Sequence, residues 1–402
     1  MRIFIADKLA SFAAGRLQDL GGLVTTETGL AGPALTARLA ALDPEVLVVR
    51  STKVTAADIA AAPSLALVIR AGSGVNTIDL AAASERGVYV TNCPGKNATA
   101  VAELAMGHLL NLDRRISDNV ASLRAGRWDK KGLGTGRGLR TRTLAIIGLG
   151  QIGGEVARLA QAFGMKVVAS SYELTPEDAA ARGIQYAATP EQAVVGADAV
   201  SVHLALVPET KRRIGASVFE AMKNGAYFLN TARAEVVDHA ALARAIAEKG
   251  IRAGLDVFDA EPGAGQAEFT DALRDDPGVY GTCHVGASTA QAEEAVAEEV
   301  VRIVAAYRAG QPIPNCVNLA SRTQATHVLV VRHADRVGVL AGVLGVLRQA
   351  GINVQDMQNI IFAGSKAACA RIHIVGEPAG ETLEQIRTAA GDAVFSVAVT
   401  PA

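Results

Sequence analysis

The chain has 402 residues, of which 50% are hydrophobic and 20% are charged, and its 39 basic and 40 acidic residues leave a formal net charge of −1. This length predicts two to three domains, and the composition excludes a disordered chain. The balanced charge argues against nucleic-acid and membrane-surface partners, and no apolar stretch approaches the ~20 residues that a membrane span needs.

The first part of the chain alternates short apolar runs, which predict buried strands, with amphipathic stretches, which predict helices. The predicted strands are residues 3–6, 46–49, 67–69 and 88–90, and the predicted helices are residues 9–20, 34–42, 56–61 and 78–86. This alternation is typical of a parallel sheet with crossover helices. A long helix is predicted from residue 98 to about residue 123, before a basic, glycine-rich stretch at 124–142.

A second α/β series follows. Its predicted strands are residues 143–147, 166–169, 199–202, 226–229, 252–257 and about 279–283, and its predicted helices include residues 151–163, 239–249 and 290–309. Residues 311–314 are Gln-Pro-Ile-Pro, and the two prolines predict a linker.

The pattern changes again from residue 326, where short strands and two helices predict a compact βαββαβ unit. In chain order, the predicted elements are a strand at 327–332, a helix at 338–350, strands at 352–361 and 367–375, a helix at 382–390 and a strand at 394–399.

The four cysteines, Cys93, Cys283, Cys316 and Cys369, are far apart in the sequence and form no CxxC pair. This spacing argues against a disulfide framework and a zinc cluster, so we expect no metal site. Reduced thiols and an N-terminal apolar run too short for a signal peptide predict a cytoplasmic protein.

Residues 148–153 are Gly-Leu-Gly-Gln-Ile-Gly, a GxGxxG motif between a predicted strand and a predicted helix. In that context Gly148, Gly150 and Gly153 allow a tight turn and close approach of a pyrophosphate to the helix N-terminus. The alternative is a glycine turn that only lets helix and strand pack. The context favours a dinucleotide-binding loop.

The carboxylate that binds the cofactor ribose is expected about 20 residues further on, at the end of the second strand. This chain has Ser171 there, followed by Glu173, and no arginine follows that would bind the 2′-phosphate of NADP. We therefore predict NAD as the cofactor.

Three polar residues follow consecutive predicted strands of the second series: Arg233, Glu261 and His284. The carboxyl ends of parallel strands are where open α/β sheets bind ligands. Oxidation of a 2-hydroxy acid needs a base for the hydroxyl proton, a carboxylate that orients the base, and a cation for the substrate carboxylate. His284, Glu261 and Arg233 suit these tasks in that order. Singly, each has a structural alternative as a core histidine or a surface ion pair, but their shared placement favours a catalytic site.

With these motifs the chain resembles the D-specific 2-hydroxyacid dehydrogenases, and within them the phosphoglycerate dehydrogenases. The resemblance runs over nearly the whole length and includes residues 49–54, Val-Arg-Ser-Thr-Lys-Val, and residues 70–75, Arg-Ala-Gly-Ser-Gly-Val. It is more specific for the superfamily than for the substrate.

The resemblance implies two doubly wound parallel-sheet domains, one flavodoxin-like and one of the Rossmann type, followed by a βαββαβ ACT domain. Residues 1–96 and 288–314 would form the substrate-binding domain, residues 97–287 the NAD-binding domain, and residues 326–402 the ACT regulatory domain. It also implies a homo-oligomer, a dimer or a tetramer. The basic stretch at 124–142 could bind nucleic acid, but its only aromatic side chain is Trp128, which favours a connector or dimer arm instead.

The resemblance also implies roles for single residues. The cofactor would contact Gly148, Gly150, Gln151, Ile152, Gly153, Ser171, Thr231, Ala232, Asp256 and Gly286, with Asp256 meeting the nicotinamide amide. The substrate would contact Arg50, Ser73, Gly74 and Asn97, with Arg50 binding a phosphate. The alternative for Arg50 is a solvated basic strand end.

Residues 333–340, His-Ala-Asp-Arg-Val-Gly-Val-Leu, resemble the ligand loop of ACT domains. The resemblance implies that His333, Asp335 and Asn353 bind an amino-acid effector such as L-serine. The alternative is that this domain only mediates oligomerisation.

The predicted reaction is the NAD-dependent oxidation of 3-phosphoglycerate to 3-phosphohydroxypyruvate, in serine biosynthesis. A hydroxypyruvate or glyoxylate reductase is an alternative, against which the ACT unit argues. A dinucleotide-sensing co-regulator is another, against which the trio of Arg233, Glu261 and His284 argues.

Overall fold

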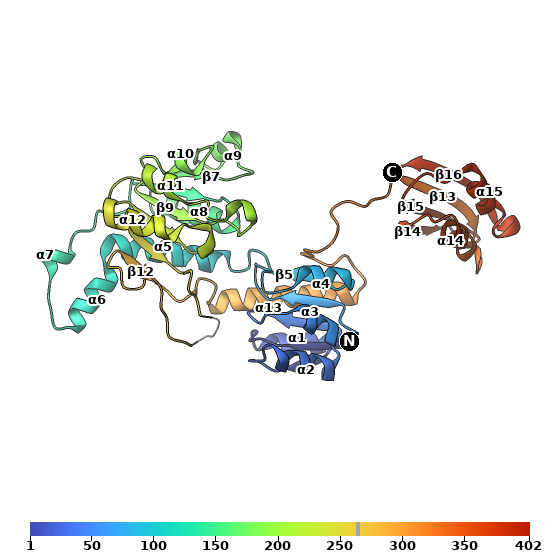
Figure 1. Cartoon of the computed structure of the whole chain (residues 1–402), viewed down its shortest axis with the longest axis horizontal. Coiled ribbons are helices and arrows are strands. Elements are labelled where there is room, and N and C mark those ends of the chain that lie inside the picture. Colours follow the sequence, from blue (N-terminus) through green and yellow to red (C-terminus); the bar gives the residue numbers. More distant parts are fainter. Residues whose placement is uncertain (263–265) are drawn as a thin grey trace. The chain divides into compact units, whose positions relative to one another are not determined.

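Figure 1 shows a computed structural model of the chain, which describes residues 1–262 and 266–402. Within these residues the chain divides into two compact units, Met1–Asn318 and Leu319–Ala402. The first unit contains parallel sheets of five and seven strands, and the second contains a four-stranded antiparallel sheet. The predicted α/β class, two parallel-sheet layers followed by a βαββαβ unit, is confirmed.

The first sheet has the strand order 2-1-3-4-5 of flavodoxin-like folds. Its strands are β2 (Leu23–Thr26), β1 (Arg2–Ile5), β3 (Val46–Val49), β4 (Leu67–Arg70) and β5 (Tyr89–Asn92). Its helices are α1 (Phe12–Asp19), α2 (Pro33–Leu42), α3 (Ala56–Ala61), α4 (Leu80–Glu85) and α13 (Ala290–Arg308). The sequence pattern does not predict β2, because this edge strand is largely exposed and carries no buried apolar run.

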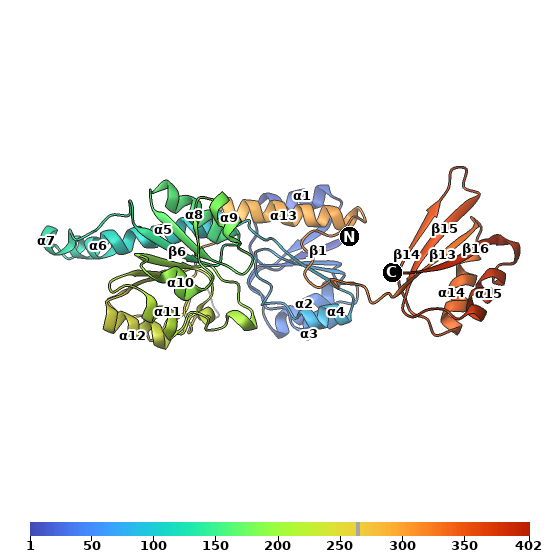
Figure 2. The ribbon, with the colours of Figure 1, turned by 90° about the horizontal axis from the view of Figure 1, so that it is seen from above.

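The two faces of this sheet are covered by different helices. α1 and α13 cover one face and α2, α3 and α4 the other, as Figure 2 shows. α13 comes from a distant part of the chain and buries Val296, Val300 and Ile303 against Ile3 and Ile69 of the sheet. Because α13 returns to this sheet, the first turn of α13 lies close to the ends of the first-sheet strands.

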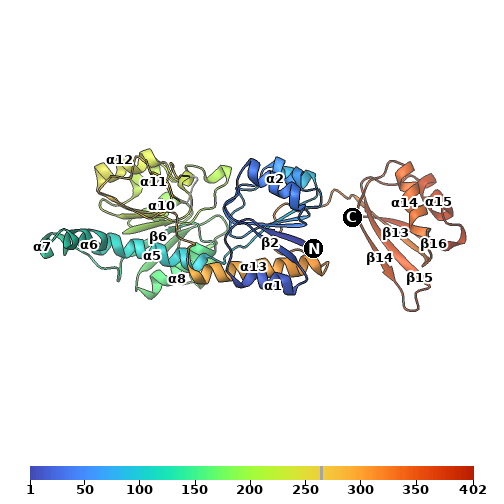
Figure 3. The ribbon, with the colours of Figure 1, turned by 90° about the horizontal axis from the view of Figure 1, so that it is seen from below.

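The second sheet has the strand order 3-2-1-4-5-6 of dinucleotide-binding folds, extended by one strand within the described residues. Its strands in that order are β8 (Gln185–Tyr186), β7 (Lys166–Ser170), β6 (Thr143–Ile147), β9 (Ala199–Val202), β10 (Tyr227–Asn230), β11 (Arg252–Leu255) and β12 (Val279–Gly281). One face is covered by α5 (Ala98–Arg114), α8 (Gln151–Ala162) and α9 (Pro176–Ala181). The other is covered by α10 (Pro190–Val194), α11 (Ala216–Ala221) and α12 (His239–Lys249), as Figure 3 shows.

The long helix predicted from residue 98 to about residue 123 is interrupted. α5 ends at Arg114, Arg115 has a left-handed backbone with φ 51°, and α6 (Ile116–Arg124) begins after it. The side chain of Asn111 accepts the backbone N–H of Ser117 at 2.9 Å, and Arg115 pairs with Asp118 at 2.7 Å. These contacts stabilise the turn. The basic stretch that follows contains α7 (Lys130–Leu133).

The segment after α13 stays attached to the first sheet beyond the predicted linker at 311–314. Val317 donates its backbone N–H to the carbonyl of Val90, and the side chain of Asn318 accepts from Val90 and donates to the carbonyl of Val88, each at 2.9 Å. These bonds cover β5, which is otherwise an open sheet edge. The first unit therefore extends to Asn318.

The second unit has the strand order β14-β15-β13-β16. In chain order its elements are β13 (His327–Ala334), α14 (Val339–Gln349), β14 (Val354–Ile361), β15 (Ala367–Ile374), α15 (Gly380–Thr388) and β16 (Val394–Pro401). The helices bury one face of the sheet through Val343, Leu347 and Ile386. Across all the described residues, no helix is both long and apolar enough to span a membrane.

Candidate active site

A cleft of about 850 Å³ opens in the first unit, among loops that follow the carboxyl ends of strands of both parallel sheets. Its lining comes from the segments after β4, β5, β6, β9, β10, β11 and β12. Ligands of open α/β sheets bind at this end of the strands, near the point where the strand order reverses. In the second sheet that point lies between β6 and β9.

The glycine motif forms the turn from β6 into α8. Gly148 has φ 93°, and a side-chain carbon there would lie 2.7 Å from the carbonyl oxygen of His203. At Gly153 such a carbon would lie 2.1 Å from the carbonyl oxygen of Gly148, whereas at Gly150 it would meet open space. Gly150, Gln151 and Ile152 line the cleft. Two glycines thus allow close packing, and the third leaves room for a ligand at the helix N-terminus.

The turn after β10 adds a polar wall to the cleft. Asn230 is fully buried; its side chain accepts the backbone N–H of Ala232 at 3.0 Å and donates to the carbonyl of Arg233 at 2.9 Å. These bonds fix Thr231, Ala232 and Arg233, which all line the cleft. The buried hydroxyl of Thr231 has no hydrogen-bond partner within the described part of the chain. A bound ligand would satisfy it.

Glu261 and His284 form a hydrogen-bonded pair beside the cleft. Oε2 of Glu261 lies 2.8 Å from Nδ1 of His284, and Oε1 accepts the backbone N–H of Phe258 at 2.9 Å. The hydrogen bond to Glu261 raises the pKa of His284. Burial opposes the charge of Glu261, but the bonds from His284 and Phe258 outweigh it and lower the pKa of the carboxyl. Because an ionised carboxylate only accepts, Nδ1 carries a hydrogen, and Nε2 remains to accept a proton.

The backbone around His284 is held by Asp256, which is 1% exposed. Its carboxylate accepts the hydroxyl of Thr282 at 2.5 Å and the backbone N–H groups of Val285 and Gly286 at 2.9 Å. His284 itself has a left-handed backbone with φ 51°, a conformation that needs such support in a non-glycine residue. A Cβ at Gly286 would lie only 2.9 Å from the Asp256 carboxylate, so a glycine leaves the room that this contact needs.

A buried histidine of α5 supports the contact between Thr282 and Asp256. Nε2 of His108 lies 3.1 Å from the hydroxyl of Thr282. Since that hydroxyl donates to Asp256, it accepts from His108, so Nε2 carries the hydrogen. Burial lowers the pKa of His108, which favours its neutral form.

The predicted substrate contacts Ser73, Gly74 and Asn97 line the same cleft as Arg233. A side-chain carbon added at Gly74 would lie 3.0 Å from Nη2 of Arg233, so this guanidinium reaches the backbone of the loop after β4. The hydroxyl of Ser73 donates to the side chain of Asn97 at 2.8 Å. The structure therefore brings together residues from both parallel sheets.

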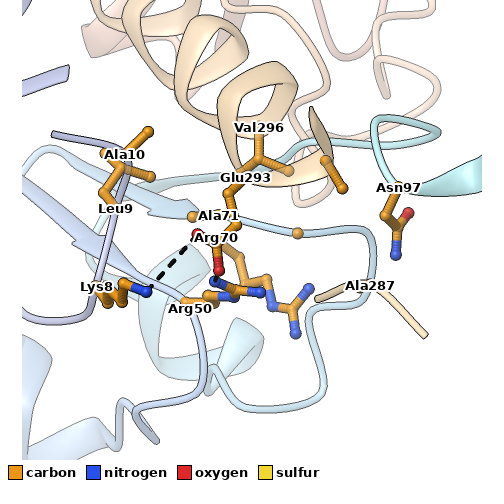
Figure 4. A pocket seen from close by; sticks show the side chains of 12 residues that line it. Lys8, Leu9, Ala10, Arg50, Arg70, Ala71, Asn97, Ala287, Glu293 and Val296 are labelled. Carbon is orange, nitrogen blue, oxygen red and sulfur yellow. Dashed lines mark hydrogen bonds and ion pairs between the residues drawn. The ribbon is translucent and has the colours of Figure 1, made fainter. Parts of the chain in front are cut away.

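Arg50 lies outside the lining of this cleft, in a smaller adjoining pocket of about 60 Å³. Arg70 lines both cavities. Figure 4 shows Lys8, Arg50 and Arg70 beside Glu293 of α13. Burial, and then the charges of Arg233 and Arg50, lower the pKa of Arg70, and its buried Nε has no hydrogen-bond partner in the described chain. This is a cationic pocket next to the cleft.

Two of the predicted sites are not assembled in this structure: the site for the cofactor ribose and the effector site of the second unit. Ser171, at the end of β7, does not line the cleft, and Glu173 is exposed in the same turn. In the second unit, His333 is 2% exposed and its Nε2 lies 3.1 Å from the side-chain oxygen of Asn359. Asn353 lies at the opposite end of the sheet, about 20 Å along the strands. One copy of the unit does not unite Asn353 with His333 and Asp335.

Known proteins are similar to this chain over its second parallel sheet and, in one relative, over its whole length. Residues 106–286 match the family model described as D-isomer specific 2-hydroxyacid dehydrogenase, NAD binding domain. The chain is 36% identical over 407 residues to D-3-phosphoglycerate dehydrogenase of Mycobacterium bovis, an alignment that covers 100% of this chain and 71% of that relative. The chain belongs to the D-isomer specific 2-hydroxyacid dehydrogenase family.

Two further proteins are similar to this chain over most of its length. D-3-phosphoglycerate dehydrogenase of Rattus norvegicus is 40% identical over 327 residues, which cover 81% of this chain and 60% of the rat protein. The crystal structure of the TT0316 protein from Thermus thermophilus is 33% identical with a TM-score of 0.70, over 79% of this chain and 100% of that one. The chain thus spans about 60% of the length of the rat relative.

Several residues of this candidate site were not identified from the sequence. Arg70 is a charged residue at the end of a predicted buried strand, a signal equivalent to the one that singled out Arg50. Lys8 follows the first strand and shows no comparable pattern. His108 and Glu293 lie on helices, and only the tertiary structure brings them to Thr282 and Arg50.

Proposed function

We propose that this chain is an NAD-dependent dehydrogenase that oxidises 3-phosphoglycerate to 3-phosphohydroxypyruvate. The observation that carries the proposal is the juxtaposition of the two cavities. The cleft contains His284 and Arg233, and the adjoining pocket contains three cationic side chains, one of which, Arg70, lines both cavities. A 2-hydroxy acid with a distal phosphate has an anionic group for each cavity, whereas lactate has only one.

In the proposed reaction, Nε2 of His284 accepts the proton of the substrate hydroxyl. Glu261, ionised and bonded to Nδ1, stabilises the imidazolium that forms and keeps the ring in one orientation. Arg233, with the backbone N–H groups of Ser73 and Gly74, holds the substrate carboxylate. Asn97, bonded to Ser73, adds a polar contact beside it.

NAD, when bound, supplies the acceptor for the hydride that leaves the substrate carbon. The turn formed by Gly150, Gln151 and Ile152 would hold its pyrophosphate at the start of α8. The Thr231 hydroxyl, which has no partner in the described chain, would bond to the cofactor. Asp256 lines the cleft while it holds residues 282–286, so one remaining lone pair would accept from the nicotinamide amide. Ser171, rather than a carboxylate, would face the ribose.

The proposal is tested by measuring NAD reduction with 3-phosphoglycerate beside lactate, glycerate and 2-hydroxyglutarate. The proposal requires that kcat/KM is highest for 3-phosphoglycerate. A higher value for glycerate would support the alternative of a hydroxypyruvate or glyoxylate reductase. NAD binding without turnover of any of these acids would support a dinucleotide-sensing co-regulator.

We also propose that the protein acts as a homo-oligomer in the cytoplasm. α6 and the stretch after it expose apolar side chains: Leu123 is 56% exposed and Trp128 is 83% exposed. A second copy of this chain would cover them. Analytical ultracentrifugation of the whole chain and of Trp128→Ser would show a weakened assembly in the variant. An unchanged mass of the assembly would contradict a role for α6 and the stretch after it in oligomerisation.

The second unit is proposed to bind L-serine or a related amino acid and to slow the enzyme. Because His333 and Asn353 lie at opposite ends of the sheet, one ligand would have to bridge two copies of the unit. Coupling of this kind is typically worth about 1–3 kcal/mol. Calorimetry and inhibition with L-serine, with glycine as a control, test the proposal. No binding at millimolar serine would leave the unit as an assembly module.

A further inference from the structure

The cationic pocket contains a carboxylate that the proposed chemistry does not use. Glu293 lies in the first turn of α13, with Oε1 2.9 Å from Nη1 of Arg50 and Oε2 3.8 Å from Nζ of Lys8. The hydrogen bond from Arg50 lowers the pKa of Glu293, so the group is ionised at neutral pH. Arg50 and Glu293 side chains are 27% and 26% exposed. The pair is therefore partly shielded from water.

The other carboxylate near Arg50 is already occupied. Asp7 accepts the backbone N–H groups of Arg50, Ser51 and Thr52, at 2.6, 3.0 and 2.9 Å. It fixes the end of β3 and so the origin of the Arg50 side chain, but it does not bond to the guanidinium. Glu293 is the carboxylate that a phosphate would have to displace from Arg50.

We propose that Glu293 is a specificity-determining residue: an internal counter-ion that Arg50 exchanges for the distal phosphate of the substrate. This inference rests on the proposed function. With Glu293 ionised, the pocket has three cations and one anion, and any second anion meets repulsion from Glu293. Glu293 therefore weakens the binding of anions that enter the pocket, and an anion tethered to the rest of the substrate overcomes this through its other contacts.

The exchange is physically feasible because neither side chain would be left as an isolated buried charge. After Arg50 turns to the phosphate, Glu293 keeps Lys8 nearby and stays in the first turn of a 19-residue helix, whose dipole favours a negative charge. Arg70 already offers a buried nitrogen without a partner in the described chain. The phosphate would then bond to Arg50 and Arg70 together.

The test compares Glu293→Gln with Glu294→Gln in the full chain. Glu294 is the next residue, exposed and outside the pocket lining, so both variants remove one negative charge from the same helix turn. Inorganic phosphate binding is measured by calorimetry, and kcat/KM is measured for 3-phosphoglycerate and D-glycerate. Glu293→Gln should lower the Kd for phosphate and the KM for 3-phosphoglycerate by about fivefold, a typical strength for a partly exposed charge interaction.

D-glycerate lacks the phosphate, so its kcat/KM should change less than about twofold in either variant, and Glu294→Gln should resemble the unmodified chain. Unchanged or weaker phosphate binding in Glu293→Gln would overturn the inference, and Glu293→Ala repeats the measurement if the first variant does not fold. If the unmodified chain does not oxidise 3-phosphoglycerate, the proposed function fails, but the phosphate titration still decides whether Glu293 opposes an anion in this pocket.

Discussion

Two glutamates of the first unit pair with cationic side chains at almost the same distance. Glu261 lies 2.8 Å from His284 in the cleft, and Glu293 lies 2.9 Å from Arg50 in the adjoining pocket. The first glutamate also accepts the N–H of Phe258, and the backbone around His284 is fixed by Asp256. Glu293 has no comparable backbone bond in the described chain, and Arg50 and Lys8 are its partners through long, flexible side chains.

The difference shows that the contact distance does not reveal what an ion pair does. A pair held by backbone bonds on both sides keeps its geometry through a reaction, which suits proton transfer. A pair whose carboxylate bonds only to long, flexible side chains can exchange partners at little cost, which suits binding and release. The following predictions test whether this contrast holds.

The largest effect is expected from breaking the cleft pair at its proton acceptor. His284→Ala should lower kcat by ~10²-fold or more, the usual contribution of a general base, while NAD binding persists. Steady-state kinetics and NAD titration by calorimetry measure the two effects separately. Near-normal turnover by a folded variant would remove His284 from the mechanism.

Breaking the pocket pair at Arg50 should affect binding rather than turnover. A charged hydrogen bond contributes about 1.5–3 kcal/mol, so Arg50→Ala should raise the KM for 3-phosphoglycerate by roughly 10–100-fold with little change in kcat. Lys53→Ala is the matched control, since Lys53 is exposed and does not line the pocket. An equal rise in KM in both variants would mean that only the general charge of this strand end matters.

Replacing the carboxylate of the cleft pair should change the pH dependence. The proposed oxidation needs neutral His284, and the bond to Glu261 raises the pKa of His284 above its ordinary value of 6.5. The acidic limb of the kcat/KM profile should therefore lie above pH 6.5 and move to lower pH in Glu261→Gln. Turnover above the limb should also fall, because the imidazolium that forms loses the carboxylate that stabilises it. An unshifted limb would assign the titration to another group.

The smallest effect concerns the cofactor, at a strand end where neither pair acts. Ser171→Asp should increase the preference for NAD over NADP by about tenfold, because a carboxylate bonds to the ribose hydroxyl and repels a 2′-phosphate. Glu173→Gln is the companion variant, and it should lower the preference if Glu173 partly replaces the missing carboxylate. Values of kcat/KM with both cofactors decide this. A natural preference for NADP would contradict the interpretation of this turn.

The sequence alone determined the alternation of strands and helices over most of the chain, and it determined which residues follow the predicted strands. Arg233, Glu261 and His284 could be predicted because each follows a buried apolar run, and parallel strands bring their carboxyl ends to one edge. The glycine motif could be placed for the same reason, since its neighbours are a strand and a helix. Local patterns also predicted the elements of the second unit within a few residues.

Only the tertiary structure decided which of these residues act on one another. β2 lacks an apolar run, and the break at Arg115 depends on side-chain contacts of Asn111 and Asp118, which no periodicity encodes. His108 reaches Thr282 from 174 positions away, and Glu293 reaches Arg50 from 243 positions away. Both lie on helices whose partners are set by how helices pack on sheets. The spacing of residues along the chain therefore identifies which side chains lie at strand ends. It does not identify the distant residues that pair with those side chains.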